Sequence, residues 1–222
     1  MLASIDRDAP DEIWCLGDLV GYGPRPNRCC ALVAERADVC LIGNHDLAAL
    51  GRLDLEIFSP DAAAAGAWTA EVLEPEPRAF LETLTPNGER EGVGLFHASP
   101  RDPVWEYVLS PGIAYAGLAA TSQDLVVVGH SHIALEFRLS TTTLATAAEG
   151  TEVELVGDRW LLNPGSVGQP RDGDPRAAWL LLDLDASRAS FRRVEYDVEK
   201  TQEEIREREL PEALAARLEH GV

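Results

Sequence analysis

The sequence has little positive charge, and almost none of that charge comes from lysine. Its 222 residues include 19 lysines and arginines against 38 aspartates and glutamates, and Lys200 is the only lysine. The formal net charge of -19 repels nucleic-acid backbones and anionic membrane surfaces. Composition therefore disfavours a protein that binds nucleic acid or a membrane surface.

Long apolar runs and paired-cysteine motifs are also missing. No stretch approaches the roughly 20 apolar residues that cross a bilayer, and the opening MLASIDRDAP lacks the basic start and apolar centre of a signal peptide. The four cysteines, Cys15, Cys29, Cys30 and Cys40, show no C-x-x-C spacing. We therefore expect reduced thiols in the core of a cytoplasmic protein.

What the sequence does contain is an alternation of strand-length apolar runs with helical patterns, which is typical of an α/β protein. A strand at 12–16, a helix at 26–36 and a strand at 38–42 form a first βαβ unit, and residues 59–84 predict two helices separated at EPEPR. Further strands are expected at 92–96, 124–128, 134–139, 151–156, 159–162, 177–184 and 190–198, and short helices at 199–209 and 211–220. No linker or repeat marks a boundary, so a single domain over 1–222 is predicted.

Polar residues gather where the predicted strands end. Asp18 follows the first strand and the tetrad GNHD (43–46) follows the second, while His97, GHSH (129–132) and NPGS (163–166) follow later strands. In open α/β sheets, ligands gather outside the carboxyl ends of the strands. These side chains are therefore expected to converge although they lie far apart in the sequence.

The residue types in these clusters suit a metal site. An aspartate oxygen can bridge two cations, and asparagine and neutral histidines can complete the ligand shells. Mixed nitrogen and oxygen ligands favour manganese, iron, zinc, nickel or cobalt over calcium, and magnesium fits a histidine-rich set poorly. Taken alone, His97 would be an ordinary histidine and Asp18 a turn residue, so the ordered series of motifs carries the prediction.

The motifs resemble, in order, those of the calcineurin-like metallophosphoesterases, in particular the small bacterial phosphodiesterase-like branch. The blocks that carry the resemblance are GDLVGYGPRPN, GNHD, HASPRDPVWEY, GHSH and NPGSVGQPRDGDPRAAW, and together they cover nearly the whole chain. The resemblance implies the αββα fold, a two-sheet β-sandwich flanked by helices. It also implies two divalent metal ions at the sheet edge, with manganese the first candidate.

The same resemblance assigns a metal-binding role to five residues. Asp18 would bridge both metals, Asn44, His97 and His130 would complete one shell, and His132 would contribute to the other. A water activated by both metals would then attack phosphorus in line with the departing alcohol. No protein nucleophile is needed for such a reaction.

Four further residues receive roles in catalysis or substrate binding. His45 resembles the family's catalytic histidine, placed to protonate the leaving oxygen or to stabilise transition-state charge, and Asp46 would orient its ring. Arg101 and Arg171 lie in loops beside HASP and NPGSVGQP, where each could clamp a phosphate or remain a solvated surface arginine.

The sequence departs from the family pattern at two places. The family's first block, Asp-x-His at the end of the first strand, is absent, and LASIDRD resembles the end of the helix that follows that strand. We therefore expect the first strand to be missing, with a sequence that starts late favoured over a degenerate family member. One metal would keep only Asp18 and His132 and bind weakly. The second departure is Gly21, where many members carry Asp or Glu.

Three functions remain open on these grounds. The first is a metal-dependent phosphodiesterase or phosphatase acting on small phosphoesters, alone or as a homo-oligomer. The second is a catalytically impaired binding module, like the retromer subunit of this superfamily, although His45 with Asp46 argues against a retired site. The third is a protein phosphatase, for which no docking segment is visible. Whether diesters or monoesters are preferred does not follow from the sequence.

Overall fold

The computed structural model describes all residues, 1–222, and divides into two compact units. Residues 1–11, 87–196 and 221–222 form one of them, which we call the sheet unit. Residues 12–86 and 197–220 form the other, which we call the helical unit. Each unit is therefore assembled from segments that lie far apart along the chain.

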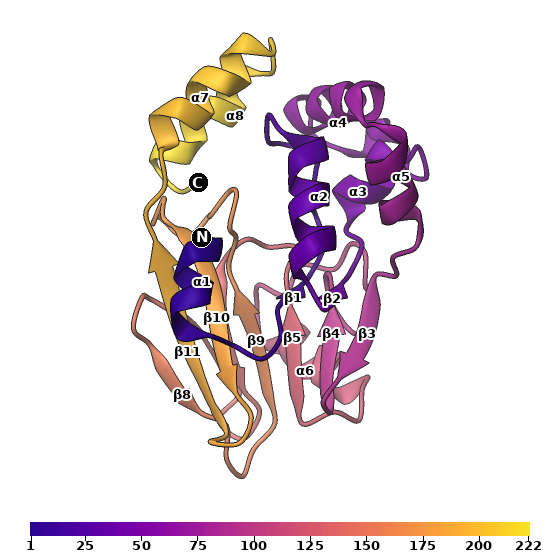
Figure 1. Cartoon of the computed structure of the whole chain (residues 1–222). Helices are drawn as coiled ribbons and strands as arrows, with labels where there is room; N and C mark the ends of the chain where they lie inside the picture. The colour runs from indigo at the N-terminus through magenta and orange to yellow at the C-terminus, as the bar shows by residue number, and fades with distance from the viewer. The chain divides into compact units, whose positions relative to one another are not determined.

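The helical unit contains two short strands and most of the helices (Figure 1). Its elements are β1 (Trp14–Cys15), α2 (Pro26–Arg36), β2 (Val39–Cys40), α3 (Asn44–Ala49), η1 (Leu55–Ile57), α4 (Pro60–Val72), α5 (Pro75–Glu82), α7 (Val198–Glu207), α8 (Glu212–Ala216) and η2 (Arg217–Glu219). β1 and β2 pair in parallel, with Trp14 opposite Val39 and Cys15 opposite Cys40. The predicted βαβ unit is present, with strands shorter than the five residues expected for each.

Proline positions explain where the helices of this unit begin. α2, α4 and α5 each carry proline in the first turn, where its fixed φ suits a helix and its missing N–H costs nothing. The Ser59 hydroxyl accepts a hydrogen bond from the Ala62 N–H at 3.4 Å and caps α4. These signals confirm the predicted bounds of α2 and the predicted break between α4 and α5.

Two apolar clusters hold the helical unit together. In one, Ala65 of α4 packs with Ile205 of α7 and Leu214 of α8, so the C-terminal helices belong to this unit. The other cluster contains Val20, Cys30, Ala49, Leu73 and Leu81. An ion pair between Arg25, the residue before α2, and Glu204 on α7 joins the first and last segments of the unit.

The sheet unit contains two β-sheets and two helices (Figure 1). Its elements are α1 (Leu2–Asp8), β3 (Asn87–Arg90), β4 (Val93–Phe96), α6 (Pro111–Ala119), β5 (Leu125–Val128), β6 (Ala134–Arg138), β7 (Thr143–Thr146), β8 (Glu152–Glu154), β9 (Trp160–Pro164), β10 (Ala177–Asp183) and β11 (Arg188–Val194). One sheet has six strands in the order β3-β4-β5-β9-β6-β7, and the other is antiparallel with the order β10-β11-β8. β4, β5 and β9 are parallel, and the remaining pairs of the six-stranded sheet are antiparallel.

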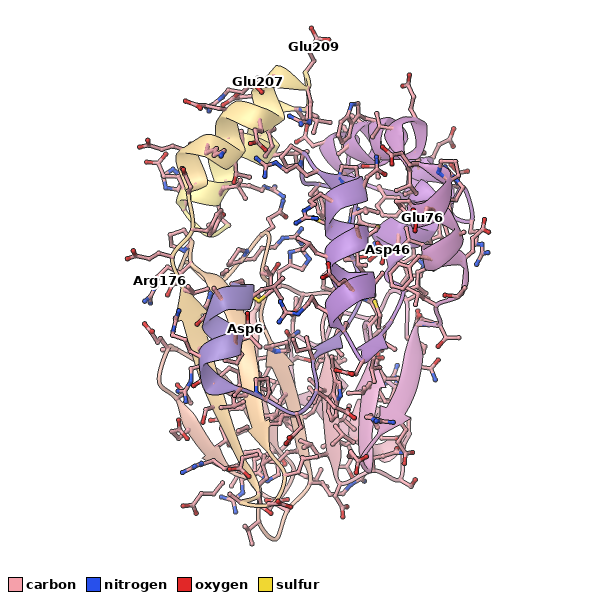
Figure 2. The ribbon with its side chains drawn as sticks, in the orientation of Figure 1. Asp6, Asp46, Glu76, Arg176, Glu207 and Glu209 are labelled. Atoms are coloured by element: carbon pink, nitrogen blue, oxygen red, sulfur yellow. The ribbon has the colours of Figure 1, made fainter.

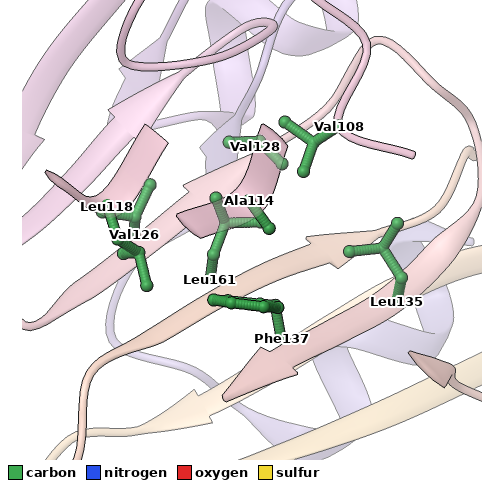
Figure 3. Packing of buried hydrophobic residues seen from close by; sticks show 8 residues of the cluster. All are labelled: Val108, Ala114, Leu118, Val126, Val128, Leu135, Phe137 and Leu161. Atoms are coloured by element: carbon green, nitrogen blue, oxygen red, sulfur yellow. The ribbon is translucent and has the colours of Figure 1, made fainter. Parts of the chain in front are cut away.

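Both faces of the six-stranded sheet are covered within this unit. Successive residues of β9 alternate between faces, so Trp160 and Leu162 pack in a cluster with Phe191 of the antiparallel sheet. Leu161 points the other way and joins Phe137 and the α6 residues in the cluster shown in Figure 3. The layers are therefore sheet, sheet and helix, which confirms the predicted mixed α/β class.

Most predicted elements are present in the structure. The elements that the sequence did not predict are short. The structure adds α3, η1, α6, β3 and β7, none of which has a strong apolar period in the sequence. All four cysteines are free, but only Cys30 is buried and Cys29 is exposed, so the expectation of four core thiols was wrong. None of the helices is both long and apolar enough to span a membrane.

Candidate functional site

The predicted residues of the helical unit lie in two loops that follow β1 and β2, and we call Asp18, Asn44, His45 and Asp46 the carboxylate cluster. The backbone N–H of Asp18 donates to Asp46 Oδ2 at 2.8 Å. In return, Asp18 Oδ1 accepts a hydrogen bond from the backbone N–H of His45 at 2.9 Å. The two carboxylates therefore tie the loop after β1 to the start of α3.

Asp46 is the buried centre of this cluster. Its side chain is fully inaccessible to solvent, whereas the other acids labelled in Figure 2, Asp6, Glu76, Glu207 and Glu209, are exposed. It accepts backbone hydrogen bonds from Gly43 at 2.9 Å and Val20 at 3.1 Å, besides the one from Asp18. These three hydrogen bonds hold the surrounding backbone in place, and the role of Asp46 in orienting the His45 ring stays a prediction.

The charge of this cluster suits a cation. Burial raises the pKa of Asp46 well above its usual range, and the nearby charge of Asp18 raises it further, against the lowering effect of the backbone N–H groups. Two acidic groups so close together in a buried site repel each other when both are ionised. A divalent cation bound to Asp18 would offset that repulsion, so the donors fit a metal ion.

Two glycines permit the close approaches that the cluster needs. A Cβ at Gly43 would lie 2.0 Å from Asp18 Oδ1, so no larger residue fits there without displacing the carboxylate. A Cβ at Gly21 would lie 2.6 Å from His45 Cβ, and Gly21 has φ +113°, which L side chains rarely adopt. The Asp or Glu that many family members carry at this position could not be accommodated here.

His45 lies between two aromatic side chains that the sequence did not identify. The ring centroid of Tyr22 is 4.1 Å from that of His45, and Phe58 makes an edge contact with centroids 5.1 Å apart. Tyr22 belongs to the block GDLVGYGPRPN, which offered a signal, whereas nothing near Phe58 did. The imidazole therefore packs against two aromatic rings, and the backbone N–H of the same residue is held by Asp18.

In the sheet unit the three predicted histidines, His97, His130 and His132, form what we call the imidazole cluster. β4 and β5 are parallel neighbours with Phe96 opposite Val128, so His97 and Gly129 follow at the same level. The Gly129 N–H donates to the His97 carbonyl at 2.9 Å, and the rings of His97 and His130 lie 5.1 Å apart. Both histidines are buried, and imidazole nitrogens are common metal ligands.

Tyr107 packs against this cluster from the loop after β4. Its ring centroid lies 4.0 Å from that of His130. Ser99 shapes the loop, because its hydroxyl donates to Glu106 Oε2 at 2.5 Å and accepts from the Arg101 N–H at 3.2 Å. The Arg101 guanidinium pairs with Glu106 at 3.0 Å, so this predicted phosphate clamp has an acidic partner in the same loop.

His132 is oriented by the loop that follows β9. Its Nδ1 lies 2.8 Å from the Gln169 carbonyl, and its own carbonyl accepts the Arg171 N–H at 3.0 Å. If Nδ1 carries the proton, Nε2 keeps the lone pair through which an imidazole binds metal. The Arg171 side chain donates to Gln169 Oε1 at 2.7 Å. Arg171, the second predicted phosphate-binding arginine, is therefore tied to the residue that contacts His132.

Asn163 joins the end of β9 to the GHSH turn. Its side-chain amide donates to the Gly129 carbonyl at 2.6 Å and to Ser131 Oγ at 3.0 Å, and its carbonyl accepts from the Gly165 N–H. The sequence had placed Asn163 in a polar cluster without assigning it a role. The structure assigns it to holding the turn that carries His130 and His132.

Three of the predicted ligands occupy unusual backbone conformations. Asp18, His130 and His132 have φ values of +54°, +59° and +60°. Non-glycine residues rarely adopt this left-handed region, and such residues cluster at functional sites, where the surrounding structure holds them in place. The hydrogen bonds of Asp46 and Asn163 provide that support for the turns after β1 and β5.

Comparison with known proteins points in one direction. Residues 1–187 match the calcineurin-like phosphoesterase superfamily domain. A metallophosphoesterase from Sphaerobacter thermophilus of known crystal structure is 41% identical, with a TM-score of 0.90 over 100% of this chain and 93% of that chain. An uncharacterized protein of Methanocaldococcus jannaschii is 38% identical over 98% of this chain and 90% of its own length. A hypothetical protein from Pyrococcus horikoshii, 20% identical with a TM-score of 0.76 over 100% of this chain and 90% of that chain, shares the fold.

Proposed function

Because the chain belongs to the calcineurin-like phosphoesterase superfamily, whose members are metal-dependent hydrolases of phosphoester bonds, we propose that it cleaves small phosphodiesters at a dinuclear centre. Asp18 would be shared between the two ions, with Asn44, His97 and His130 on one and His132 on the other. The second ion would have fewer protein ligands and a lower affinity.

The observation that carries the proposal is the hydrogen bond between Asp18 and the His45 backbone. Asp18 Oδ1 accepts the His45 N–H at 2.9 Å. The proposed bridging ligand therefore fixes the start of α3, which carries the proposed proton donor. Bound divalent ions would supply Lewis-acid polarisation of the phosphoryl oxygens and a lower pKa for the attacking water.

His45 would donate its proton from Nε2. The Nδ1 side of the ring lies against Gly21, since a Cβ there would be 2.8 Å from Nδ1. Nε2 is at the other side of the ring and is the nitrogen available to a leaving alkoxide. Tyr22 and Phe58 limit rotation of the imidazole, so the proton is delivered in one direction.

Two features support a diester substrate. A phosphodiester carries one negative charge where a monoester carries up to two, and a chain with a net charge of -19 repels the monoester more. The aromatic side chains of Tyr22 and Phe58 beside His45 also offer apolar surface to the second ester substituent. A dianionic monoester lacks this second substituent and gains nothing from a surface that binds it.

The test is hydrolysis of bis-para-nitrophenyl phosphate and para-nitrophenyl phosphate by the purified chain with Mn²⁺. We expect faster turnover of the diester and a loss of roughly 10²–10⁴-fold in kcat for His45→Ala. His220→Ala is the matched control, because His220 is exposed and outside both clusters, and it should keep full activity. Equal turnover by the wild type and His45→Ala would overturn the role of His45, and a preference for the monoester would overturn the substrate class.

Metal content separates this proposal from a non-catalytic binding module. The proposed enzyme should retain a transition metal after purification and bind Mn²⁺ in one tight and one weak step. A protein that takes up no metal in mass-spectrometric analysis and in Mn²⁺ titration would instead support the binding module.

A further inference from the structure

The four cysteines all lie in the helical unit, and two of them face each other across a pair of strands. Cys15 on β1 and Cys40 on β2 are direct partners in the parallel register. Partners in such a ladder have side chains on the same face, and neighbouring strands lie about 4.8 Å apart. Disulfides join Cα atoms about 4.4–6.8 Å apart, so the register places these two residues within the range that a disulfide spans.

The two thiols also interact with each other. Both residues are partly exposed, whereas Cys30 is buried. A hydrogen bond with Cys40 lowers the pKa of Cys15, and the same interaction raises the pKa of Cys40. Cys15 is therefore the sulfur that ionises first, with Cys40 beside it as the second thiol.

We propose that Cys15 and Cys40 are a modification site, which a hydroperoxide converts into a reversible disulfide between β1 and β2. The pair stands on its register and partial exposure, and it does not depend on the proposed phosphodiesterase activity. Cys29 and Cys30 are adjacent in α2 and are not expected to take part.

The reaction balances with the hydroperoxide as oxidant. The Cys15 thiolate attacks one oxygen, the O–O bond breaks, and the alkoxide or hydroxide that leaves takes up a proton, which gives a sulfenic acid on Cys15. The Cys40 thiol then attacks the Cys15 sulfur, the S–S bond forms, the S–O bond breaks, and hydroxide leaves with the Cys40 proton as water. Two electrons pass from the sulfurs to the peroxide, and a small thiol reverses the change.

The disulfide would reinforce the weakest sheet of the protein. β1 and β2 form a two-stranded sheet with two residues in each strand, and such a sheet has little stability alone. The loop with Asp18 follows β1, and α3 with His45 follows β2. A covalent bond between Cys15 and Cys40 would join the two strands just before these segments. It would thereby hold the loop with Asp18 close to the start of α3.

Peptide mapping of the whole chain tests the site. After treatment with hydrogen peroxide, alkylation of remaining thiols and trypsin digestion, we expect peptide 8–28, with Cys15, linked to peptide 37–52, with Cys40, and Cys29 and Cys30 alkylated in peptide 29–36. The link should disappear with dithiothreitol and in Cys15→Ser and Cys40→Ser, and persist in Cys29→Ser. Full alkylation of Cys15 and Cys40 after peroxide, or a link through Cys29 or Cys30, would overturn the proposal.

Thermal unfolding gives a second measurement that needs no variant. The oxidised wild type should unfold roughly 5–10 °C above the reduced protein, because the cross-link constrains the unfolded chain between residues 15 and 40. Fully linked protein with an unchanged Tm would show that the bond does not reinforce the sheet.

Discussion

The carboxylate cluster and the imidazole cluster are positioned by different forces. In the helical unit, the strands before Asp18 and Asn44 have two residues each, and the loops are fixed by two carboxylates that accept backbone hydrogen bonds. In the sheet unit, His97 and His130 follow strands within a six-stranded sheet that is buried on both faces. One cluster therefore depends on a few polar contacts, and the other on a large apolar core.

This difference has a consequence for mutations. Loss of one polar side chain in the carboxylate cluster leaves buried N–H groups unsatisfied at the site itself. Loss of an apolar side chain in the sheet core costs stability, while the strand ends keep their register. Variants of the carboxylate cluster should therefore lose activity and stability together, whereas variants of the sheet core should lose mainly stability.

The largest expected effect is on activity in Asp46→Ala. The change leaves the N–H groups of Asp18, Val20 and Gly43 without their acceptor, so we expect kcat to fall by roughly 10²–10³-fold and unfolding free energy by about 3 kcal/mol. Assays with bis-para-nitrophenyl phosphate and urea unfolding measure both. The control is Asp38→Asn, at an exposed acid that accepts a hydrogen bond from the Ile13 N–H. Similar losses of kcat and stability in both variants would contradict a specific role of Asp46 in positioning the cluster.

The next largest effect is on stability in Phe137→Ala. Phe137 is fully buried in the cluster between the six-stranded sheet and α6 (Figure 3). We expect a loss of about 3–5 kcal/mol in unfolding free energy, with kcat changed less than tenfold at a temperature where the variant is folded. Val156→Ala, at an exposed position, should change neither. A drop in kcat as large as that of Asp46→Ala would break the proposed contrast.

Arg193→Met sharpens the comparison, because it tests a polar contact within the sheet unit. Arg193 on β11 forms a buried ion pair with Asp172, which follows Arg171 in the loop that orients His132. Removal of one partner leaves the other charge buried, which should cost about 3 kcal/mol. The double variant Arg193→Met, Asp172→Asn should recover part of this loss in urea unfolding, and equal instability of single and double variants would argue against a charge effect.

The smallest effect is the pH dependence contributed by Asp158. Hydrogen bonds from Ser140 and Arg138 lower the pKa of Asp158 to about 2. A carboxyl with a lowered folded pKa stabilises the protein above its unfolded pKa, about 4, and this contribution is lost as the pH falls through about 2. The urea midpoints of the wild type and Asp158→Asn should therefore differ at pH 5 and approach each other towards pH 2. A constant difference would contradict this assignment.

The strand and helix pattern of the chain could be predicted where local signals were strong. The proline at the start of α2, the Ser-Pro pair at α4 and the apolar runs of β4, β5 and β9 each mark an element within the neighbouring residues. α3 was missed because its polar start, GNHD, has the composition of a turn, and six residues are too few for a helical period. The order in which β9 lies between β5 and β6 depends on long-range packing, which no local pattern records.

For the candidate site too, local sequence signals and long-range packing have to be distinguished. Its polar residues could be found because each follows a strand, but the contacts of Tyr22, Phe58 and Tyr107 with the histidines depend on how distant loops pack. The motif GNHD indicated Asp46, but the backbone N–H groups of Asp18, Val20 and Gly43 that bind its side chain could not be read from the motif. Residue type and spacing indicated which side chains matter, while their contacts required the three-dimensional structure.

The left-handed conformations of Asp18, His130 and His132 imply that selection for heat resistance and selection for activity would diverge at these positions. Glycine at any of them would relieve roughly 1–2 kcal/mol of backbone strain, but it would also remove a proposed ligand. A library screened only for thermal survival should therefore accumulate glycine there and lose metal binding. A library screened for turnover should keep the strained residues and gain its stability in the sheet core.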